Sequence, residues 1–505
     1  MDINSFRQAA RSYINSISLG QPLDDRRVLQ LTYPGEIELP GLAKILALEQ
    51  PPGNQQELLE NVLILEDFIK YTIRPAGSDP VETSTEVIKY LVNNSLPRSG
   101  FLDPLPYSQD EELHLTEKDI AWFYVLSYRT FLCLKHFQPP SLDAEDNTLI
   151  LRVGFLASYT DLNDPWTSAI LHKKSTELLK DSFQFYTSKA WKNLLTGLLE
   201  VKVKPAFAVK NHPKITKSAR KVIGMGETRA TLAGEDIMIK PWKFDEVFVP
   251  TILRWVLLQL EQVDTTFIEA VWPLIVPPIL TLIDDTSIKY KIAGCSDLAV
   301  LLQMRPFAML NRTGLGEVFE DAVMPCLMYL PTLEKEVDSV ALLKEAYPAI
   351  IRLGCERFPT TEHQDLRMRS LDRIMRYGIL KGYAHAGEYA RIAEVLITQV
   401  IELVKQMGIH VVRHAKSTLT FVWPRMAYYR VNVLESLVLC WLRVRGDEAS
   451  FAHSKPIHNE IKATLSLVAA LMPKDVDFFS EFRELVQSDP RLEELLIDDG
   501  WRDSW

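Results

Sequence analysis

The sequence predicts an all-α protein built as a HEAT-like α-solenoid, in which helix pairs stack on one another. Two observations lead to this fold class. Residues 271–302 have the pattern of one complete helix pair, and a similar pattern recurs 47 residues later, close to the roughly 40 to 47 residues of this repeat class. Because a single pair would leave an apolar face in water, successive pairs must stack.

The first helix of this pair is apolar and interrupted by proline. Residues 271–283 contain three prolines, so the stretch is too short and too interrupted to cross a membrane. Residues 284–287 supply turn formers and an N-cap for the second helix. In the second helix we expect one buried apolar face, with Lys289 and Lys291 lying off it. The members of that face are Ile288, Ile292, Cys295, Ala299 and Leu302.

A second pair follows in the same register. Aligning Pro278 with Pro325 gives the shift of 47 residues and superimposes two apolar stretches that follow these prolines. Residues 331–339 then supply a turn, and an amphipathic helix is expected to follow and to end at Gly354. Its apolar positions are Val340, Leu343, Ala346, Ile350 and Leu353.

The N-terminal half is also helical, but its pattern is less regular. Asn54 with Glu57, and Asp79 before Pro80, resemble helix N-caps, in which a short polar side chain satisfies free amides. Apolar residues at helical spacing predict helices near residues 56–73, 81–95, 117–137 and 166–187.

Composition and pattern divide the chain into four parts. Seven basic residues lie between Lys202 and Lys221, and no acid follows until Glu227. This run is either a solvated loop or a site for an anionic partner. The four parts are residues 1–200, an N-terminal helical region; residues 201–241, a basic loop that contains glycine; residues 242–498, HEAT-like helical repeats; and residues 499–505, a C-terminal tail.

The composition is that of a globular protein with an acidic net charge. Hydrophobic residues make up 47% and charged residues 24% of the 505 residues, an ordinary balance for a packed chain. The formal net charge of −10 argues against direct nucleic-acid binding, which needs concentrated lysine and arginine. The five cysteines lack metal or disulfide spacing, and the N-terminus lacks a signal peptide. We therefore expect a reducing compartment and no membrane association.

The sequence offers little catalytic chemistry. Gly224 and Gly226 lack the lysine spacing and the preceding strand of a phosphate-binding loop. His410 and His414 are four residues apart and would share a helix face, as zinc ligands can, but the acid of the H-E-x-x-H motif is missing. A loop and a packing helix are the simpler interpretations. We therefore expect no catalytic site, no cofactor and no metal.

Residues 371–389 are the most distinctive segment of the chain. LDRIMRYGILKGYAHAGEY mixes apolar positions with three glycines, although each glycine costs about 1 kcal/mol inside a helix. Two interpretations remain open: glycines that permit close packing within a protein-binding surface, or a helix end capped by glycine. The candidate protein-binding residues here are Gly378, Gly382, Tyr383, His385, Gly387, Glu388 and Tyr389.

The same segment belongs to a set of motifs that resembles a known family. The other motifs are residues 240–244 (KPWKF), 282–295 (LIDDTSIKYKIAGC), 311–331 (NRTGLGEVFEDAVMPCLMYLP), 353–355 (LGC) and 407–416 (MGIHVVRHAK). Together they closely resemble the family of the second Tel-Two-interacting protein, which contributes one subunit to the Triple T complex. The resemblance extends over residues 165–445.

The resemblance implies a HEAT-like helical scaffold without a catalytic centre, found in the cytoplasm and the nucleus. Its implied partners are the other two Triple T subunits, directly the large HEAT subunit. They also include the ninety-kilodalton heat-shock chaperone, its RuvB-like ATPase adaptor, and client phosphatidylinositol-kinase-related kinases. The alternative is a HEAT-type adaptor of another pathway, such as nuclear transport or trafficking.

The chain departs from the family pattern in one place. In the family a further turn and helix precede the tryptophan-proline-arginine element. Here only residues 419–422 separate Thr418 from Trp423. About one helix is therefore absent, through natural shortening or an error in the gene model.

The C-terminus combines acids with aromatic residues. Phe478, Phe479 and Phe482 recur at helical spacing and predict a capping helix over residues 476–488. Trp501 and Trp505 lie in the charged tail and are candidate protein-binding residues, because tryptophans often anchor interfaces. Folding back onto the helices, docking onto a partner and a free tail all remain open.

Overall fold

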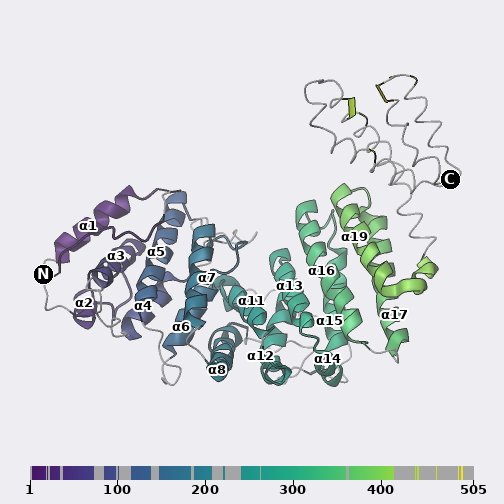
Figure 1. Ribbon diagram of the computed structural model, residues 1–505, viewed down its shortest axis with the longest axis horizontal. Coiled ribbons are helices and arrows are strands. Elements are labelled where there is room, and N and C mark those ends of the chain that lie inside the picture. Colours follow the sequence, from purple (N-terminus) through teal and green to yellow (C-terminus); the bar gives the residue numbers. More distant parts are fainter. Residues whose placement is uncertain are drawn as a thin grey trace. The chain divides into compact units, whose positions relative to one another are not determined.

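The computed structural model of the protein describes most of the chain up to residue 414. The described residues are 3–414, except 19, 21–22, 34–37, 73–84, 98–100, 102–114, 138–146, 184–186, 208–219, 222–239, 262 and 360–362, together with 438, 441, 442, 462, 487, 489, 491 and 492. Across these residues every regular element is a helix (Figure 1). The prediction of an all-α protein is therefore confirmed.

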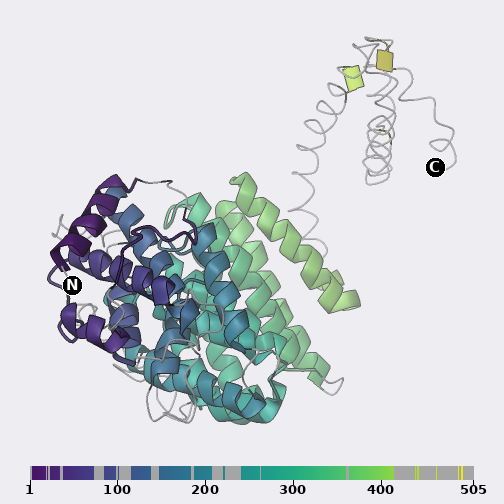
Figure 2. The same cartoon turned by 60° about the vertical axis from the view of Figure 1, so that its left-hand side comes forward.

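The chain divides into two compact units, Met1–Ile374 and Met375–Trp505. In the first unit successive helices lie beside one another, and Figure 2 shows them as one packed body of helices. Its N-terminal helices are α1 (Ile3–Ser16), α2 (Leu39–Ile45), α3 (Gln55–Thr72), α4 (Thr85–Ser95), α5 (Glu117–His136), α6 (Thr148–Ala157), α7 (Ala169–Phe183), α8 (Ser188–Leu198), the π-helix η3 (Leu199–Val203) and α9 (Lys204–Phe207).

The rest of the first unit contains the predicted helix pairs. Its helices are α10 (Pro241–Phe244), α11 (Val249–Leu260), α12 (Thr265–Ile283), α13 (Ile288–Gln303), α14 (Phe307–Thr313), α15 (Leu315–Val323), the 3-10 helix η4 (Met324–Met328), α16 (Glu336–Glu356) and α17 (Gln364–Arg373). The second unit contains α18 (Lys381–Ala386), α19 (Ala390–Met407) and the 3-10 helix η7 (Gly408–His414), and the π-helix η6 (Ile374–Leu380) begins at the division between the units.

Two of the predicted N-terminal helices are found almost as expected. The helices expected at 56–73 and 117–137 are α3 and α5. Thr116 caps α5 through a capping box with Asp119, which satisfies free amides at the helix start. The helix expected at 166–187 begins later, at Ala169, because the residues before it form a turn around Trp166. Of the helix expected at 81–95, residues 81–84 lie outside the described part of the chain.

The helix α12 contains Pro273, Pro277 and Pro278, as the sequence indicated. It is the one helix among the described residues that is long and apolar enough to cross a membrane. More than half of its apolar window is buried inside the protein, however, and it packs against α13 and α15. The structure therefore uses this apolar helix as part of the core.

The expected outward position of Lys291 on α13 is wrong. Lys291 is buried, and its Nζ donates a hydrogen bond of 2.9 Å to the Ile283 carbonyl. The cause is the position of α13, which packs against α11, α12 and α16 and so has little free surface. Gly294 brings two backbones together, because a Cβ there would lie 2.6 Å from the Ile283 nitrogen. Lys289 remains exposed, as expected.

The helix expected before Gly354 is α16, which begins at Glu336, inside the turn expected over residues 331–339, and continues to Glu356. It starts 48 residues after α13, one more than the proline alignment gave. The connection before α16 is longer than the one before α13, because it contains the 3-10 helix η4 and an isolated bridge between Pro331 and Glu334.

The loop predicted for residues 201–241 begins later than expected. Residues 199–203 form the π-helix η3 and residues 204–207 form α9, and Val203, Ala206 and Phe207 are buried. The basic residues of this stretch concealed the apolar ones between them. Residues 208–219 and 222–239 lie outside the described residues, so the remaining loop prediction stays a prediction.

Candidate protein-interaction surface

The motif KPWKF forms a short cover over the turn before α13. Lys240 and Lys243 reach the Asp285 carboxylate at 2.9 and 2.8 Å, and the Ser287 amide donates to the same group at 2.8 Å. Burial would raise the pKa of Asp285, but the hydrogen bonds from Lys243, the Ser287 amide and Lys240 outweigh burial and lower it. The charge of this buried acid is therefore matched within the chain.

Trp242 completes the cover. Its ring stacks on Phe207 with centroids 5.1 Å apart and meets the edge of Tyr290 at 4.7 Å. Trp242 is almost fully buried, so α10 excludes water from the start of α13. The KPWKF motif and the motif at 282–295, which are separate in the sequence, thus form one structural site.

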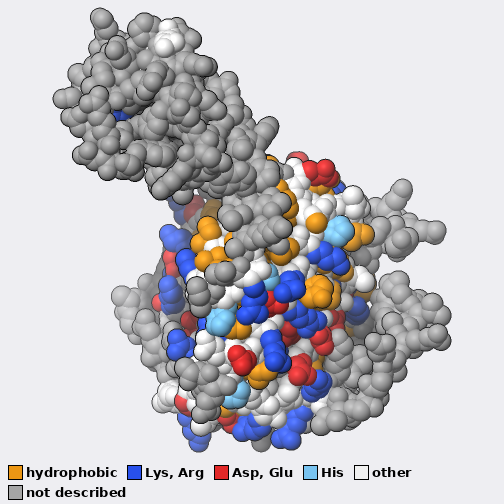
Figure 3. Space-filling view, turned by 90° about the vertical axis from the view of Figure 1, so that its right-hand side faces the viewer, with side chains coloured by type: hydrophobic (Ala, Val, Ile, Leu, Met, Phe, Trp, Pro, Cys, Tyr) orange, Lys and Arg blue, Asp and Glu red, His pale blue; other side chains and the backbone are white. Residues whose placement is uncertain are grey.

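A second polar site lies among α15, α16 and α17. It is a hollow of about 350 Å³. Figure 3 shows a face of the molecule on which basic, acidic and hydrophobic side chains lie next to one another. The residues that line the hollow are Glu317, Glu320, Asp321, Arg357, Phe358, Leu366, Arg369, Ser370 and Arg373.

Two arginines fix the buried acid of this hollow. Glu320 accepts hydrogen bonds from Arg357 at 2.5 Å and from Arg373 at 3.0 Å. Gly316 leaves room for Arg357, because a Cβ there would lie 2.5 Å from the Arg357 Nε. Arg369, by contrast, is exposed and has no ion pair among the described residues. The hollow can therefore offer one cation to an anionic group.

One residue of the basic run docks beside this hollow. The Lys221 amide donates to the Thr313 carbonyl at 2.9 Å, and its ammonium forms an ion pair with Glu317. Gly314, between α14 and α15, has a φ of +69°, which favours glycine. The hydrogen bond from Lys221 lowers the pKa of Glu317. Lys221 therefore meets an acid of its own chain, and it need not meet an anionic partner.

The family model described as the Tti2 family matches residues 153–426, more than half of the chain. The chain belongs to the Tti2 family. No solved structure matches it. The Asp285 site and the hollow both lie inside the Tti2 family match, and so does Lys221.

The candidate residues at 378–389 do not form a single patch. Gly378 lies in η6 and Gly382 in α18, and both are buried. His385 and Glu388 are exposed, whereas Tyr383 and Tyr389 are half-buried. The segment thus presents two polar side chains to solvent and keeps its glycines inside.

Position 387 requires a residue without a side chain, because the backbone of Tyr383 lies very close to it at the end of α18. Its amide donates to the Tyr383 carbonyl at 2.7 Å, and a Cβ would lie 2.6 Å from that oxygen. Its φ of −63° is right-handed, so it is not the left-handed cap that usually ends a helix with glycine. Gly387 is nevertheless the C-cap residue of α18, as the helix-end interpretation expects, and a role of these glycines in a protein-binding surface stays a prediction.

The other candidates separate into described and undescribed residues. His410 and His414 lie on η7, a 3-10 helix with about three residues per turn. Residues four apart therefore do not share its face, and the expectation of a shared face is wrong. Among the described residues no group of His, Cys, Asp and Glu could hold a metal ion. Gly224, Gly226, Trp501 and Trp505, the segment 418–423, and all of 476–488 except residue 487 lie outside the described residues.

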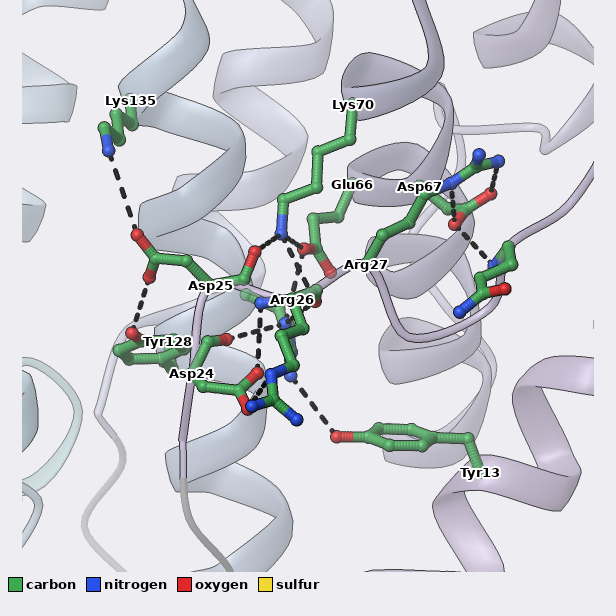
Figure 4. A network of polar contacts seen from close by, with 12 residues as sticks. Tyr13, Asp24, Asp25, Arg26, Arg27, Glu66, Asp67, Lys70, Tyr128 and Lys135 are labelled. Carbon is green, nitrogen blue, oxygen red and sulfur yellow. Dashed lines mark hydrogen bonds and ion pairs between the residues drawn. The ribbon is translucent and has the colours of Figure 1, made fainter. Parts of the chain in front are cut away.

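Sequence reasoning missed an extended polar network in the N-terminal region (Figure 4), most of which lies before the part matched by the Tti2 family. Asp25 accepts hydrogen bonds from Tyr128 at 2.7 Å and from Lys174 at 2.9 Å. Burial would raise the pKa of Asp25, but the hydrogen bonds from Tyr128 and Lys174 outweigh burial and lower it. The two acids followed by two arginines at residues 24–27 were the available signal.

Two further acids complete the network. Glu66 pairs with Arg129 at 3.3 Å and also with Lys70. Burial raises the pKa of Glu66, although both cations act to lower it. Asp67 accepts from Arg27 at 2.6 Å and also from the Gln30 and Leu31 amides. The segment that follows α1 is therefore fixed to α3, α5 and α7.

Proposed function

We propose that the protein is a non-catalytic scaffold subunit of the Triple T co-chaperone complex. In this role it supports the maturation and stability of phosphatidylinositol-kinase-related kinases by the heat-shock chaperone. The observation that carries the proposal is membership of the Tti2 family over residues 153–426. The sequence motifs of that region form packing contacts and ion pairs, as in the Asp285 site and the hollow.

We also propose that the helices of the first unit form a HEAT-like solenoid. The helix α12 packs on α13, α15 packs on α16, and the two pairs contact each other through α13 with α16 and α12 with α15. Contacts of this kind between successive pairs are those expected of stacked repeats. A stack of this type offers long surfaces for protein partners rather than an enclosed catalytic pocket.

The proposed partners are the other two Triple T subunits, directly the large HEAT subunit, and through them the heat-shock chaperone, its RuvB-like ATPase adaptor and the client kinases. The proposed location is the cytoplasm and the nucleus. We propose that the segment at 378–389 and the tryptophans Trp501 and Trp505 contribute to partner contacts. The exposure of His385 and Glu388 supports this for the first of them.

Co-expression of the full chain with the other two Triple T subunits tests this function. We expect a tagged chain to recover both subunits in stoichiometric amounts, and its depletion from cells to lower the levels of the client kinases. Recovery of transport or trafficking factors in place of these subunits would favour the adaptor alternative and contradict the proposal.

A further inference from the structure

The turn between η4 and α16 presents apolar side chains to solvent. Leu333 is 75% exposed and Val337 is 63% exposed, the two highest values among the large hydrophobic side chains of the described residues. They lie four residues apart, in the turn and in the first turn of α16. Apolar side chains at such exposure gain no hydrophobic stabilisation, whereas burying them against a partner surface would provide it.

The backbone of this turn is well defined. The Leu333 and Glu334 amides both donate to the Leu330 carbonyl, at 3.1 and 3.3 Å. Thr332 has a φ of +89°, a strained value for a β-branched residue. Strain of this kind persists when the surroundings hold it, and it is commonest at functional positions. The turn therefore holds Leu333 outward on a fixed support.

The corresponding turn of the preceding helix pair is covered. Before α13, the segment of Lys240, Trp242 and Lys243 lies on the turn and supplies two cations and one large ring. Before α16 no described segment takes this position, since Leu333 and Val337 remain exposed. The two turns precede the second helices of neighbouring pairs, so the second turn is the counterpart of a surface that the chain covers elsewhere.

Charge indicates what could cover it. Residues 334–338 contain Glu334, Glu336 and Asp338 against the single cation Lys335. None of these three acids has an ion pair among the described residues. Acids at the start of a helix interact favourably with the helix dipole, which explains their place in the sequence. Their charge remains available to a partner. The surface formed by these three acids is complementary in charge to a basic segment.

We propose that Leu333 and Val337 form a docking surface for a basic segment of a partner subunit. The segment would place an apolar side chain on Leu333 and Val337 and its lysines or arginines beside Glu334, Glu336 and Asp338. The arrangement is that of Lys240, Trp242 and Lys243 on the preceding turn. This inference rests on the proposed function, because it takes the partner to be a protein subunit of the same complex.

Paired substitutions test the apolar contact. The variant Leu333→Ser with Val337→Ser is compared with Leu162→Ser, which changes a leucine that is 56% exposed on another turn. Affinity for the purified pair of other Triple T subunits is measured by titration. We expect at least a tenfold loss for the double variant and less than a twofold change for the control. Equal melting temperatures establish that both variants are folded.

Charge reversal tests the acidic part of the surface. We expect Glu334→Lys with Glu336→Lys to weaken binding at least fivefold and to reduce its dependence on salt. The matched control is Glu177→Lys with Asp181→Lys, two exposed acids on α7, for which we expect no such change.

The outcomes separate the two proposals. If the wild-type chain does not bind the other subunits, the proposed function is wrong. If it binds them and the folded Leu333 and Val337 variant binds equally well, the function stands and the docking surface is wrong. If the wild-type chain instead self-associates and the double variant is monomeric, the occupant is a second copy, which also contradicts this proposal.

Discussion

At the scale of single residues, Asp285 shows how one carboxylate holds two segments together. Its side chain is fully buried and accepts hydrogen bonds from lysines 45 and 42 residues earlier in the chain. Removing one member of a buried ion pair leaves the other charges without a partner, which costs more than the pair itself contributes.

We therefore expect Asp285→Asn to lower the free energy of unfolding by about 3 kcal/mol. Urea denaturation followed by circular dichroism measures this change. Asp245→Asn, which alters an exposed acid near the same lysines, serves as the control and should change stability by less than about 0.5 kcal/mol. Equal stability of both variants would show that the lysines find other partners.

The same residue gives a prediction for pH. The pKa of Asp285 is lowered in the folded protein. Its contribution to the free energy of unfolding is therefore fully present above the pKa of the unfolded chain, about 3.9, and is lost as pH falls through the pKa of the folded protein. The stability difference between wild type and Asp285→Asn should therefore be constant near neutral pH and should shrink below about pH 4. Urea denaturation at a series of pH values measures it. A difference that grows in acid would contradict the ion pair.

Gly387 offers a second test at residue scale. Because a Cβ would lie 2.6 Å from the Tyr383 carbonyl oxygen, Gly387→Ala should destabilise the second unit by about 1 to 3 kcal/mol. Gly41→Ala is the control: it has no neighbour within 4 Å inside α2, and alanine there should add up to about 1 kcal/mol. Thermal unfolding of both variants measures the contrast. A neutral Gly387→Ala would show that the end of α18 can shift.

At the scale of elements, the turn after α6 is fixed to α11 by a partly buried acid. Thr251 donates a hydrogen bond of 2.5 Å to Asp164. Burial raises the pKa of Asp164 to about 7, against the lowering effect of that hydrogen bond. Asp297, which pairs with Arg254 at 3.2 Å, also has its pKa raised by burial to about 7. Both acids take up protons more readily in the folded protein than in the unfolded chain.

These raised values predict stability that falls as pH rises from about 4 to 7, because the folded protein then binds more protons than the unfolded chain. Asp164→Asn removes one of the two contributions, so its stability should fall less over this range. Chemical denaturation at a series of pH values measures the slope, with the exposed Asp181→Asn as control. An unchanged slope in Asp164→Asn would mean that Asp164 is ionised in the folded protein.

The elements also show how far the sequence alone could lead. The helices α3, α5, α12 and α16 were predictable, because apolar residues recur at helical spacing along them. The burial of Lys291 was not predictable, because it depends on the helices that surround α13 rather than on the sequence pattern of α13. The same holds for η3 and α9, where Val203 and Phe207 are buried between basic residues.

Of the candidate site, the sequence identified the motifs but not their contacts. Asp285 was predicted as a turn former and Lys240 only as part of a family motif, and their ion pair requires three-dimensional proximity. The arginines that hold Glu320 come from the C-cap of α16 and from α17, far along the chain. Such pairs carry no local signal, so pattern reasoning could not find them.

At the scale of the whole molecule, the polar network ties the N-terminal elements of the first unit together. Arg129 of α5 bonds to Glu66 on α3, to the Asp24 carbonyl and, at 3.4 Å, to Tyr13 on α1. The arginine and the glutamate are both almost completely buried. One side chain thus connects three elements, and its loss should affect the region as a unit.

We expect Arg129→Gln to lower the free energy of unfolding by about 3 kcal/mol, because it leaves Glu66 buried with one cation fewer. Arg26→Gln alters an arginine in the same network that is 88% exposed, and it should change stability by about 0.5 kcal/mol or less. Thermal unfolding compares the two. If both variants unfold at the wild-type temperature, water has replaced the arginine.

The network also sets an order of events during synthesis. Asp25 leaves the ribosome 149 residues before its partner Lys174, and at roughly 5 to 20 residues per second this delay lasts about 7 to 30 s. During that time Asp25 lacks Lys174, so the segment that follows α1 lacks its attachment to α7. Until α7 has been made, the segment that follows α1 is therefore held only by its contacts to α3 and α5.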